Sequence, residues 1–236
     1  MRSLIIIFSA FLFTTCQKGN KNIFIPKDVI KPAIESKGNY NYLALGDSYT
    51  IGQGVSLAES FPYQLANTLT KAGYTIPAPK IIATTGWTTD QLIQAIKKEN
   101  ITSRYDIVTL LIGVNNQYQG YSEVTYRKEF IELLNIASAY AKGKEHVFVL
   151  SIPDWGVTPY AGNGLSSSIS IEIDRFNAIN KEEALKAGIA YIDITPISRA
   201  AATDPLLIAS DGLHPSGKMY SMWVDLLAPL VQNKIK

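Results

Sequence analysis

The stretch Tyr42-Leu43-Ala44-Leu45-Gly46-Asp47-Ser48-Tyr49 decides the fold class of this chain. Its first half is a continuous apolar run, and a run that does not alternate with polar residues is typical of a strand buried on both faces. The Gly-Asp-Ser segment that follows brings a carboxyl and a hydroxyl to the end of that strand. In open α/β sheets, ligands bind outside the carboxyl ends of the strands. We therefore expect Ser48 to lie where such a fold binds its ligand.

Apolar runs of the same kind recur along the chain and alternate with helical patterns. The expected strands are Tyr42–Leu45, Lys80–Ala83, Ile107–Ile112, Val147–Ile152 and Ala190–Ile194. The expected helices are Phe61–Ala72, Thr89–Lys98, Tyr126–Ala141, Ile171–Ala187 and Ser216–Val231. Thr88 or Thr89 is expected to cap the second helix, and Gly73, Gly143 and Gly188 are expected to end three of the patterns. The alternation predicts an α/β fold in which a parallel sheet of about five strands has helices on both faces.

The size and composition of the chain fit one globular domain. A length of 236 residues allows a sizeable core, and 47% apolar against 18% charged residues excludes a disordered chain. The formal net charge is +2, and no basic run with interleaved aromatic residues is present. The sequence therefore gives no support to a nucleic-acid partner. It also shows no internal repeat and no sign of a second domain.

The N-terminus has the pattern of an export signal. Met1-Arg2 is a short positive segment, and Leu4–Phe13 is an apolar run that is too short to remain as a membrane-spanning helix. The run ends at Phe13-Thr14-Thr15-Cys16, and Cys16 is the single cysteine of the chain. This segment resembles a bacterial lipoprotein signal, in which the cysteine becomes the lipidated first residue of the mature protein. The alternative is an ordinary secretory signal that is cleaved nearby.

These patterns predict the organisation of the whole chain. We expect a signal peptide over residues 1–15, a lipidated N-terminus and Lys- and Pro-containing tether over 16–39, and the folded domain over 40–236. A lipid on Cys16 would attach the exported protein to a membrane of the bacterial cell envelope, on the periplasmic or surface-facing side. Without the lipid the protein would be secreted. A single cysteine excludes an internal disulfide.

The polar residues that can carry chemistry fall just after the expected strands. Ser48 follows the first strand, Gly86 the second and Asn115 the third. Asp211 and His214 lie beyond the last strand, in the segment Ser210-Asp211-Gly212-Leu213-His214-Pro215. Because the carboxyl ends of parallel strands meet at one edge of the sheet, we expect all five residues in one site.

Serine, histidine and aspartate are the residue types that acyl transfer needs. A serine hydroxyl is a weak nucleophile until a base takes its proton. Histidine is that base, and aspartate fixes the tautomer of the imidazole and stabilises the imidazolium. Each residue also has a structural interpretation. Asp47-Ser48 can act only as a helix N-cap, and Asp211 only as a turn residue before Pro215.

Other chemistries have less support in this sequence. The mid-chain Gly-x-Ser-x-Gly elbow of α/β-hydrolases is absent, since Gly46-x-Ser48-x-Thr50 stands at the first strand. Two histidines and one exported cysteine do not supply an ordinary set of zinc ligands. Gly52-Gln53-Gly54 lacks the lysine and the spacing of a phosphate-binding loop. We therefore expect no metal site and no cofactor.

Four blocks of the chain resemble the motifs of the GDSL, or SGNH, family of serine hydrolases. They are Gly46-Asp47-Ser48, the isolated Gly86, Gly113-Val114-Asn115 and Asp211-Gly212-Leu213-His214, in the order and at the approximate spacing of the family. The resemblance extends from about Tyr42 to the C-terminus. It implies a three-layer α/β/α sandwich of the flavodoxin-like SGNH-hydrolase type over 40–236, and hydrolysis of carboxylic esters through an acyl-serine intermediate.

The same resemblance implies a role for each motif residue. Ser48 is then the nucleophile, His214 the general base and Asp211 the carboxylate that supports it. The oxyanion hole is then formed by the N–H groups of Ser48 and Gly86 and the side-chain amide of Asn115. A glycine at position 86 would also allow the backbone to approach the ligand without a Cβ in the way.

The substrate pocket is expected to be narrow and largely aromatic. Tyr49 replaces the leucine of the four-letter family name, and Asn116 stands where the family often has aspartate, so these two positions bear on the substrate. The residues expected to line the pocket are Tyr49, Trp87, Asn116, Tyr118 and Trp155, with Tyr121 and Tyr160 near the same mouth. Aromatic faces can stack on sugar rings or enclose a short acyl chain.

Two titratable residues outside this set have structural interpretations. Asp154, in Ile152-Pro153-Asp154-Trp155, follows the fourth strand and is expected to form a turn. His146 precedes that strand, in Lys144-Glu145-His146, and is expected to be a solvated surface residue.

The function expected from the sequence is that of a serine esterase or lipase acting on a small-molecule or glycan ester. One alternative is a carbohydrate O-acetylesterase, which would cleave acetylated sugars and no longer acyl chains. An alternative of another class is an inactive ligand-binding lipoprotein, which the presence of serine, histidine and asparagine disfavours. The sequence does not indicate the oligomeric state.

Overall fold

The computed structural model describes residues 37–162 and 166–235. The chain divides into two compact units, Met1–Ala33 and Ile34–Lys236, and all described residues belong to the second. The expected signal peptide over 1–15, the lipidation site Cys16 and nearly all of the expected tether therefore lie outside the described residues.

The core of the second unit is a parallel sheet, as the sequence predicts. Its strands are β1 (Tyr42–Gly46), β2 (Lys80–Ala83), β3 (Ile107–Leu111), β4 (Val147–Leu150) and β5 (Ala190–Ile192), in the order β2-β1-β3-β4-β5. All neighbouring strands run parallel, and β1, which lies between β2 and β3, pairs Ala44 with Ile81 on one side and with Thr109 on the other. The reversal of strand order next to β1 places the end of this strand at a crevice of the kind that binds ligands.

Helices connect the strands. The long ones are α2 (Phe61–Lys71), α3 (Thr89–Lys98), α5 (Glu123–Tyr140), α6 (Ser166–Ala187) and α8 (Gly217–Lys234). Short helices that the sequence analysis did not predict are α1 (Ser48–Ile51), α4 (Val114–Tyr118) and α7 (Thr195–Arg199). The single-turn 3₁₀ segments include η2 (Leu57–Glu59), η4 (Trp155–Val157), η5 (Pro159–Ala161) and η7 (Pro205–Leu207). Helix α6 begins five residues before the expected Ile171, so Ser166–Ser168 start a helix rather than form a loop.

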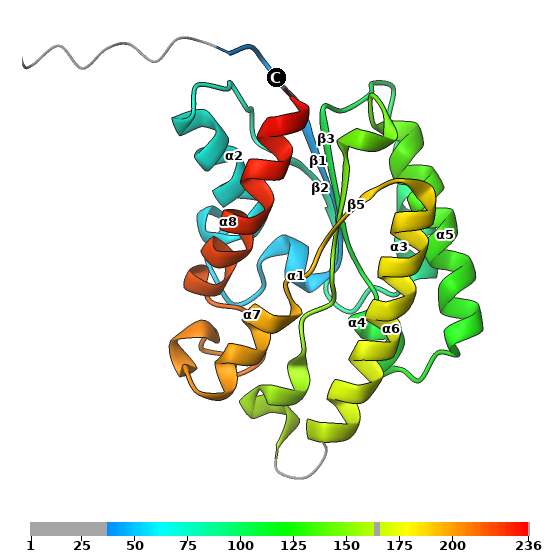
Figure 1. Cartoon of the computed structure of the whole chain (residues 1–236), viewed down its shortest axis with the longest axis vertical. Coiled ribbons are helices and arrows are strands. Elements are labelled where there is room, and N and C mark those ends of the chain that lie inside the picture. The colour runs from blue at the N-terminus through cyan, green and yellow to red at the C-terminus, as the bar shows by residue number, and fades with distance from the viewer. Residues whose placement is uncertain (1–36, 163–165, 236) are drawn as a thin grey trace, which may run out of the picture. The chain divides into compact units, whose positions relative to one another are not determined.

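The helices lie on both faces of the sheet, which confirms the three-layer α/β/α architecture. Figure 1 shows α2 and α8 on one face and α3, α5 and α6 on the other. The three inner strands, β1, β3 and β4, are buried on both faces, while the edge strands β2 and β5 are partly exposed. Leu43, Leu45, Leu110 and Val149 have no exposed surface, as expected from apolar runs that do not alternate.

The predicted helix ends are correct at three of four positions. Thr88 is the N-cap of α3, and its N–H donates to Gln91 Oε1 over 3.1 Å. Gly73 and Gly188 follow α2 and α6 with φ of +98° and +70°, the left-handed conformation of a C′ glycine. The prediction for Gly143 is wrong. Its φ of −179° is extended, and α5 has already ended at Tyr140.

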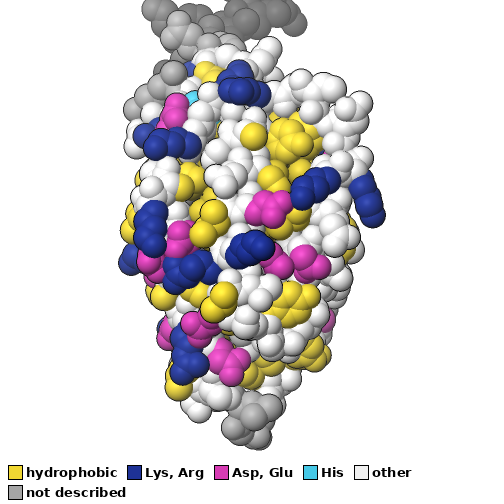
Figure 2. All heavy atoms as spheres, turned by 90° about the vertical axis from the view of Figure 1, so that its right-hand side faces the viewer, with side chains coloured by type: hydrophobic (Ala, Val, Ile, Leu, Met, Phe, Trp, Pro, Cys, Tyr) yellow, Lys and Arg dark blue, Asp and Glu magenta, His cyan; other side chains and the backbone are white. Residues whose placement is uncertain are grey.

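The surface of the α3, α5 and α6 layer carries both signs of charge. Figure 2 shows lysine and arginine side chains interspersed with aspartate and glutamate on this face. Ion pairs such as Arg127–Glu182 and Lys97–Glu132, each at 2.8 Å, join neighbouring helices. In residues 37–162 and 166–235, no helix has the length and apolar character needed to cross a membrane.

Candidate active site

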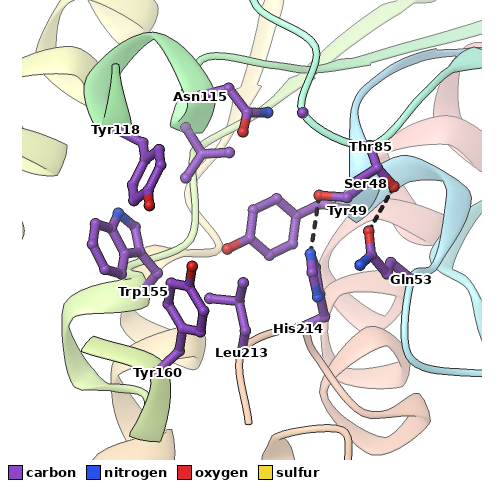
Figure 3. A pocket seen from close by; sticks show the side chains of 12 residues that line it. Ser48, Tyr49, Gln53, Thr85, Asn115, Tyr118, Trp155, Tyr160, Leu213 and His214 are labelled. Carbon is purple, nitrogen blue, oxygen red and sulfur yellow. Dashed lines mark hydrogen bonds between the residues drawn. The ribbon is translucent and has the colours of Figure 1, made fainter. Parts of the chain in front are cut away.

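A cavity of about 280 Å³ lies at the carboxyl ends of the strands. It is lined by Ser48, Tyr49, Gln53, Thr85, Gly86, Val114, Asn115, Tyr118, Trp155, Tyr160, Leu213 and His214. The lining residues come from the segments that follow β1, β2, β3 and β4 and from the segment before α8. Figure 3 shows Gln53 and Thr85 on one side of Ser48, and Tyr118, Trp155 and Tyr160 on the other.

Ser48, His214 and Asp211 form a hydrogen-bonded chain. His214 Nε2 lies 3.0 Å from Ser48 Oγ, and His214 Nδ1 lies 2.7 Å from Asp211 Oδ2. Ser48 and His214 are buried, with 4% and 5% of their surface exposed. The structure thus brings together residues that lie 166 positions apart in the chain, with the nucleophile–base–carboxylate geometry of acyl-transfer enzymes.

The surroundings of Asp211 keep its carboxyl ionised. Partial burial by itself would raise the pKa of Asp211. The N–H groups of His214 and Leu213, which donate to Oδ1 over 2.9 and 3.0 Å, and the imidazole outweigh that effect and hold the pKa below its ordinary value. An ionised carboxylate only accepts hydrogen bonds, so His214 Nδ1 carries the proton and Nε2 is left to accept from the Ser48 hydroxyl.

Asp47 builds the turn that presents Ser48. It is the N-cap of α1, and its Oδ1 accepts the N–H of Tyr49 over 3.0 Å. Asp47 is completely buried, and its Oδ2 has no hydrogen-bond partner among the described residues. This burial raises the pKa of Asp47 to about 7, although the bond from Tyr49 opposes the shift. The helix-cap interpretation therefore holds for Asp47, while the hydroxyl of Ser48 points at His214.

Gly86 and Asn115 lie in the same cavity, as predicted. Asn115 Nδ2 donates to the carbonyl of Trp87 over 2.9 Å, which ties α4 to the loop that carries Gly86 and leaves the second amide hydrogen unused by that bond. Gly86 has a φ of +82°, and a Cβ there would meet no atom within 4 Å. Position 86 therefore needs glycine because its backbone is left-handed, and not because a side chain there would collide with neighbouring atoms of the protein.

Three of the five expected pocket residues line the cavity. Tyr49, Tyr118 and Trp155 do so, and Tyr160, expected near the mouth, does as well. The ring of Tyr49 lies 5.4 Å from that of His214. The ring of Trp155 lies 5.6 Å from Tyr118 and 6.1 Å from Tyr160. The three aromatic rings form one wall of the cavity (Figure 3).

Asn116, Trp87 and Tyr121 do not line the cavity, and these expectations are corrected. Asn116 is completely buried, where it accepts the N–H of Thr89 over 3.0 Å and donates to its hydroxyl over 2.7 Å. It therefore joins α4 to α3. Trp87 packs against the core, and the Tyr121 hydroxyl points to Asp90 at 3.4 Å.

Sequence reasoning missed four residues that line the cavity: Gln53, Thr85, Val114 and Leu213. Three of them directly precede a motif residue: Thr85, Val114 and Leu213. Their position next to a motif residue could have identified them as lining residues. Gln53 comes back to the site because α1 ends at Gly52 with a φ of +77°. Its Oε1 accepts the hydroxyl of Thr85 over 2.6 Å.

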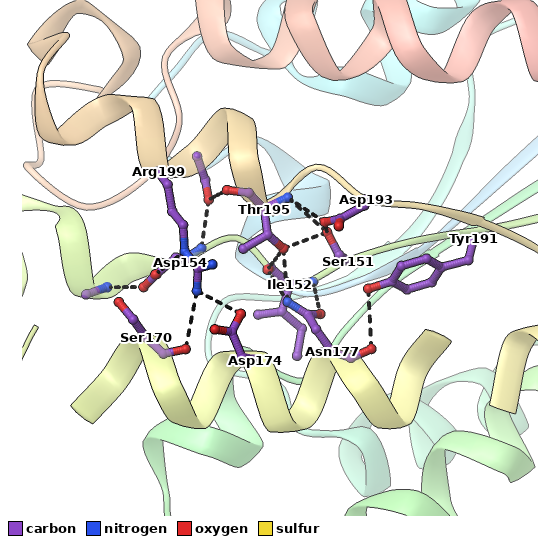
Figure 4. Close-up of polar contacts among 12 residues, drawn as sticks. Ser151, Ile152, Asp154, Ser170, Asp174, Asn177, Tyr191, Asp193, Thr195 and Arg199 are labelled. Atoms are coloured by element: carbon purple, nitrogen blue, oxygen red, sulfur yellow. Dashed lines mark hydrogen bonds and ion pairs between the residues drawn. The ribbon is translucent and has the colours of Figure 1, made fainter. Parts of the chain in front are cut away.

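Asp154 forms the expected turn, and the environment of His146 differs from the expectation. Asp154 caps η4 through Gly156 N–H, and its second oxygen pairs with Arg199 Nε at 2.8 Å (Figure 4). His146 is half-buried rather than solvated, and its Nδ1 lies 2.7 Å from the carbonyl oxygen of Asp106. Neither residue lines the cavity.

Within residues 37–162 and 166–235, no three or more His, Cys, Asp or Glu side chains gather in an arrangement that would hold a metal ion.

Structures with the same fold include several hydrolases. A lipase/acylhydrolase from Enterococcus faecalis superposes with a TM-score of 0.64 and 19% identity, covering 84% of this chain and 97% of that one. A variant of Axe2, an acetyl xylan esterase from Geobacillus stearothermophilus, gives a TM-score of 0.63 and 16% identity over 84% and 96% of the two chains. TesA superposes with a TM-score of 0.60 and 17% identity, covering 83% of this chain and 98% of TesA. At these identities the likeness establishes the fold.

Comparison of the sequence itself gives the family. No curated protein sequence matches significantly. The family model described as "GDSL-like Lipase/Acylhydrolase family" matches residues 44–222, which include Ser48, Gly86, Asn115, Asp211 and His214. This match covers well over half of the chain, so the protein belongs to the GDSL-like lipase/acylhydrolase family and is an ester hydrolase.

Proposed function

We propose that Ser48 is the nucleophile of this ester hydrolase, that His214 is its general base, and that Asp211 orients the base. The observation that carries the proposal is the chain of two hydrogen bonds, 3.0 and 2.7 Å long, from Ser48 Oγ through the imidazole to Asp211. The chain opens onto a cavity large enough for an ester group and its neighbouring atoms.

The reaction follows from this geometry. Ser48 Oγ bonds to the carbonyl carbon of the ester while its proton passes to His214 Nε2. The carbon–oxygen bond to the alcohol then breaks, and Nε2 returns the proton to the leaving oxygen. In the second half, His214 takes a proton from water as the water oxygen bonds to the acyl carbon. The bond to Oγ breaks, Oγ regains its proton from His214, and the carboxylic acid is released.

Three donors are available for the negative charge that forms on the carbonyl oxygen. They are the N–H groups of Ser48 and Gly86 and the amide of Asn115. Ser48 is the first residue of α1, so its N–H has no carbonyl one turn earlier in the helix to bond. Loss of one such donor lowers the rate by roughly 10²–10³. We expect Asn115→Ala to cause a loss of this size in kcat.

The proposal is tested with p-nitrophenyl esters from acetyl to decanoyl. Wild type should hydrolyse at least one of them, and Ser48→Ala should not. Ser103→Ala is the matched control, because Ser103 is exposed and lies outside the cavity. A fluorophosphonate should label wild type and Ser103→Ala, and should not label Ser48→Ala. Labelling of another residue, or turnover that persists in Ser48→Ala, would exclude Ser48 as the nucleophile.

A second candidate substrate is an acetylated carbohydrate. Tyr118 and Tyr160 are 58% and 56% exposed on either side of Trp155, and exposed aromatic faces of this kind can stack on sugar rings. A structural neighbour is an acetyl xylan esterase, which motivates the choice of probe. Release of acetate from acetylated xylooligosaccharides, with no turnover of octanoyl esters, would favour this substrate. The opposite profile would favour esters of longer fatty acids.

We also propose that the protein is exported and attached to a membrane through a lipid on Cys16. The support is the sequence pattern of residues 1–16 alone, which lie outside the described residues. Expressed in a bacterial host, the full chain should incorporate labelled fatty acid and sediment with membranes. Cys16→Ser should do neither. A wild-type protein found unlabelled in the medium would instead indicate an ordinary secretory signal.

A further inference from the structure

A second cavity shares a wall with the active-site cavity. It has a volume of about 10 Å³, and three of its lining residues, Tyr49, Trp155 and Leu213, also line the active-site cavity. A space of this size holds about one water molecule or one methyl group. These three side chains are therefore the partition between the substrate site and a second, much smaller space.

The rest of the second cavity suits a hydrocarbon rather than a polar group. Pro153, Ile208, Pro215 and Met219 provide most of its remaining wall. Met219 is buried, and a methionine side chain adapts its shape more easily than a branched one. An apolar chain end that entered from the active site would thus meet apolar atoms that can adjust around it.

The polar residues that border this cavity already have hydrogen-bond partners. The carboxylate of Asp154 pairs with Arg199 and accepts the N–H of Gly156 (Figure 4). Ser198 Oγ accepts the N–H of Asp154, and Thr158 Oγ1 donates to a main-chain carbonyl. Because these groups are satisfied within the protein, they leave little to stabilise a polar substituent in so small a space.

Leu213 is the part of the partition that can be changed without altering the catalytic hydrogen bonds. The ring of Tyr49 packs against His214, and Trp155 Nε1 is held by Gln117 Oε1 over 2.8 Å. Leu213 contacts Asp211 through its main-chain N–H, and any residue at this position keeps that bond. Figure 3 shows the Leu213 side chain between Tyr160 and His214.

We propose that Leu213 limits the length of the hydrocarbon chain that the active site accepts, and that the second cavity is an apolar subsite for the end of that chain. This inference rests on the proposed function, since it concerns the substrate of the same site. The chain can belong to the acyl part or to the alcohol part of the ester, and the two are separated by experiment.

The test uses the full chain as wild type, Leu213→Ala, Leu213→Val and Val114→Ala. Val114 is the matched control, because it lines the active-site cavity and not the second one. One substrate series varies the acyl chain of p-nitrophenyl esters, and the other varies the alcohol of acetyl esters. Leu213→Ala should raise kcat/KM by about fourfold for each further methylene that enters the opened space, relative to the shortest ester.

The expected result is a shift toward longer chains in one series only, which also identifies the part of the ester that enters the subsite. Leu213→Val should shift the profile in the same direction by less, and it serves as the measurement if the alanine variant fails to fold. Adding Ile208→Phe to Leu213→Ala should reverse the shift, since Ile208 lines only the second cavity.

Failure of this inference and failure of the proposed function give different results. If wild type hydrolyses esters but the profiles of Leu213→Ala and Leu213→Val match that of Val114→Ala, the subsite is excluded and the function stands. If wild type hydrolyses no ester and Ser48 reacts with no fluorophosphonate, the proposed function fails and this inference fails with it.

Discussion

At the scale of single residues, Asp211 sets the tautomer of His214. Its Oδ1 accepts two main-chain N–H groups and its Oδ2 faces His214 Nδ1. In Asp211→Asn the amide oxygen keeps the two main-chain bonds, and the NH₂ group then faces Nδ1. The imidazole would bear its proton on Nε2 instead, where it cannot accept from Ser48.

We therefore expect Asp211→Asn to lower kcat by a factor on the order of 10²–10⁴ with little change in thermal stability. Steady-state kinetics and a thermal melt measure the two effects. Asp211→Ala provides the comparison, because it also removes the acceptor of the Leu213 and His214 N–H groups and should destabilise the turn. An Asn variant with nearly wild-type kcat would show that Asp211 serves only the turn.

Asp47 predicts a pH dependence of stability. Burial raises its pKa in the folded protein from the ordinary 3.8 to about 7. Below both pKa values the carboxyl of Asp47 is protonated in the folded and in the unfolded chain, so the free energy of unfolding is not reduced by this residue. As the pH rises, the unfolded chain releases this proton first, so stability is lost through the folded pKa and stays constant above it. The loss between these two values is on the order of 4 kcal/mol.

Asp47→Asn should remove this dependence, and its free energy of unfolding should be flatter between pH 4 and 7 than that of wild type. Urea denaturation across this range gives the measurement. The lowered pKa of Asp211 acts with the opposite sign and only below its ordinary value, so it does not enter this window. Parallel curves for the two proteins would contradict a neutral Asp47 in the folded state.

At the scale of elements, two turns after strands need glycine for different reasons. Gly113, between β3 and α4, has a φ of +125°, and a Cβ there would overlap the Tyr126 hydroxyl and lie 2.8 Å from Ile152 Cδ1. Gly86 has a φ of +82° and open space around it. We expect Gly113→Ala to lower the free energy of unfolding by about 2–4 kcal/mol, and Gly86→Ala by about 1–2 kcal/mol.

The two variants should rank in the opposite order when activity is compared at a temperature where both are folded. Gly86→Ala displaces an N–H that we assign to the oxyanion hole, so its kcat should fall further. Denaturation and kcat measured on the same preparations separate the effects. A loss of kcat in Gly86→Ala no larger than in Gly113→Ala would remove position 86 from the oxyanion hole.

For the strands, the sequence predicted where each one begins better than where it ends. Strands β3, β4 and β5 stop before the expected Ile112, Ile152 and Ile194, yet these three residues are almost completely buried. An apolar run continues wherever the chain remains buried, even after its backbone has left the sheet, so composition alone cannot mark that point. Helices α1, α4 and α7 have four or five residues, little more than one turn, so no repeating helical pattern of apolar residues can be recognised in them.

At the scale of the whole molecule, the site was predictable because the motif residues follow four strands of one parallel sheet. The direction in which neighbouring side chains point could not be predicted from the sequence. Asn115 and Asn116 are adjacent on α4, and successive helical side chains point about 100° apart, so one faces the cavity and the other α3. The partition formed by Tyr49, Trp155 and Leu213 likewise depends on packing between distant segments.

The contacts of residues 37–41, which stabilise the fold, and the residues that form the cavity lie at opposite ends of the strands. The carboxyl ends of the strands carry the cavity, while residues 37–41 pair with the chain near the amino ends. The N–H of Lys37 donates to the carbonyl of Gly73. The N–H of Tyr40 donates to the carbonyl of Thr75, and the N–H of Thr75 donates to the carbonyl of Gly38. Asn41 and Asp106 exchange bonds of 3.0 and 2.8 Å between the side chain of each and the N–H of the other.

This separation predicts the outcome of two truncations. A chain of residues 37–236 keeps every one of these bonds and should match the full chain in kcat/KM. A chain of residues 42–236 loses the eight hydrogen bonds that join residues 37–41 to Gly73, Thr75 and residues 104–107 in the described part of the chain. At about 1 kcal/mol for each bond, it should lose roughly 5–8 kcal/mol of stability. Its kcat/KM should stay near that of 37–236 wherever it is folded, because none of the lost groups lines the cavity. A fall in kcat/KM at full folding would show that the amino ends of the strands also position the site.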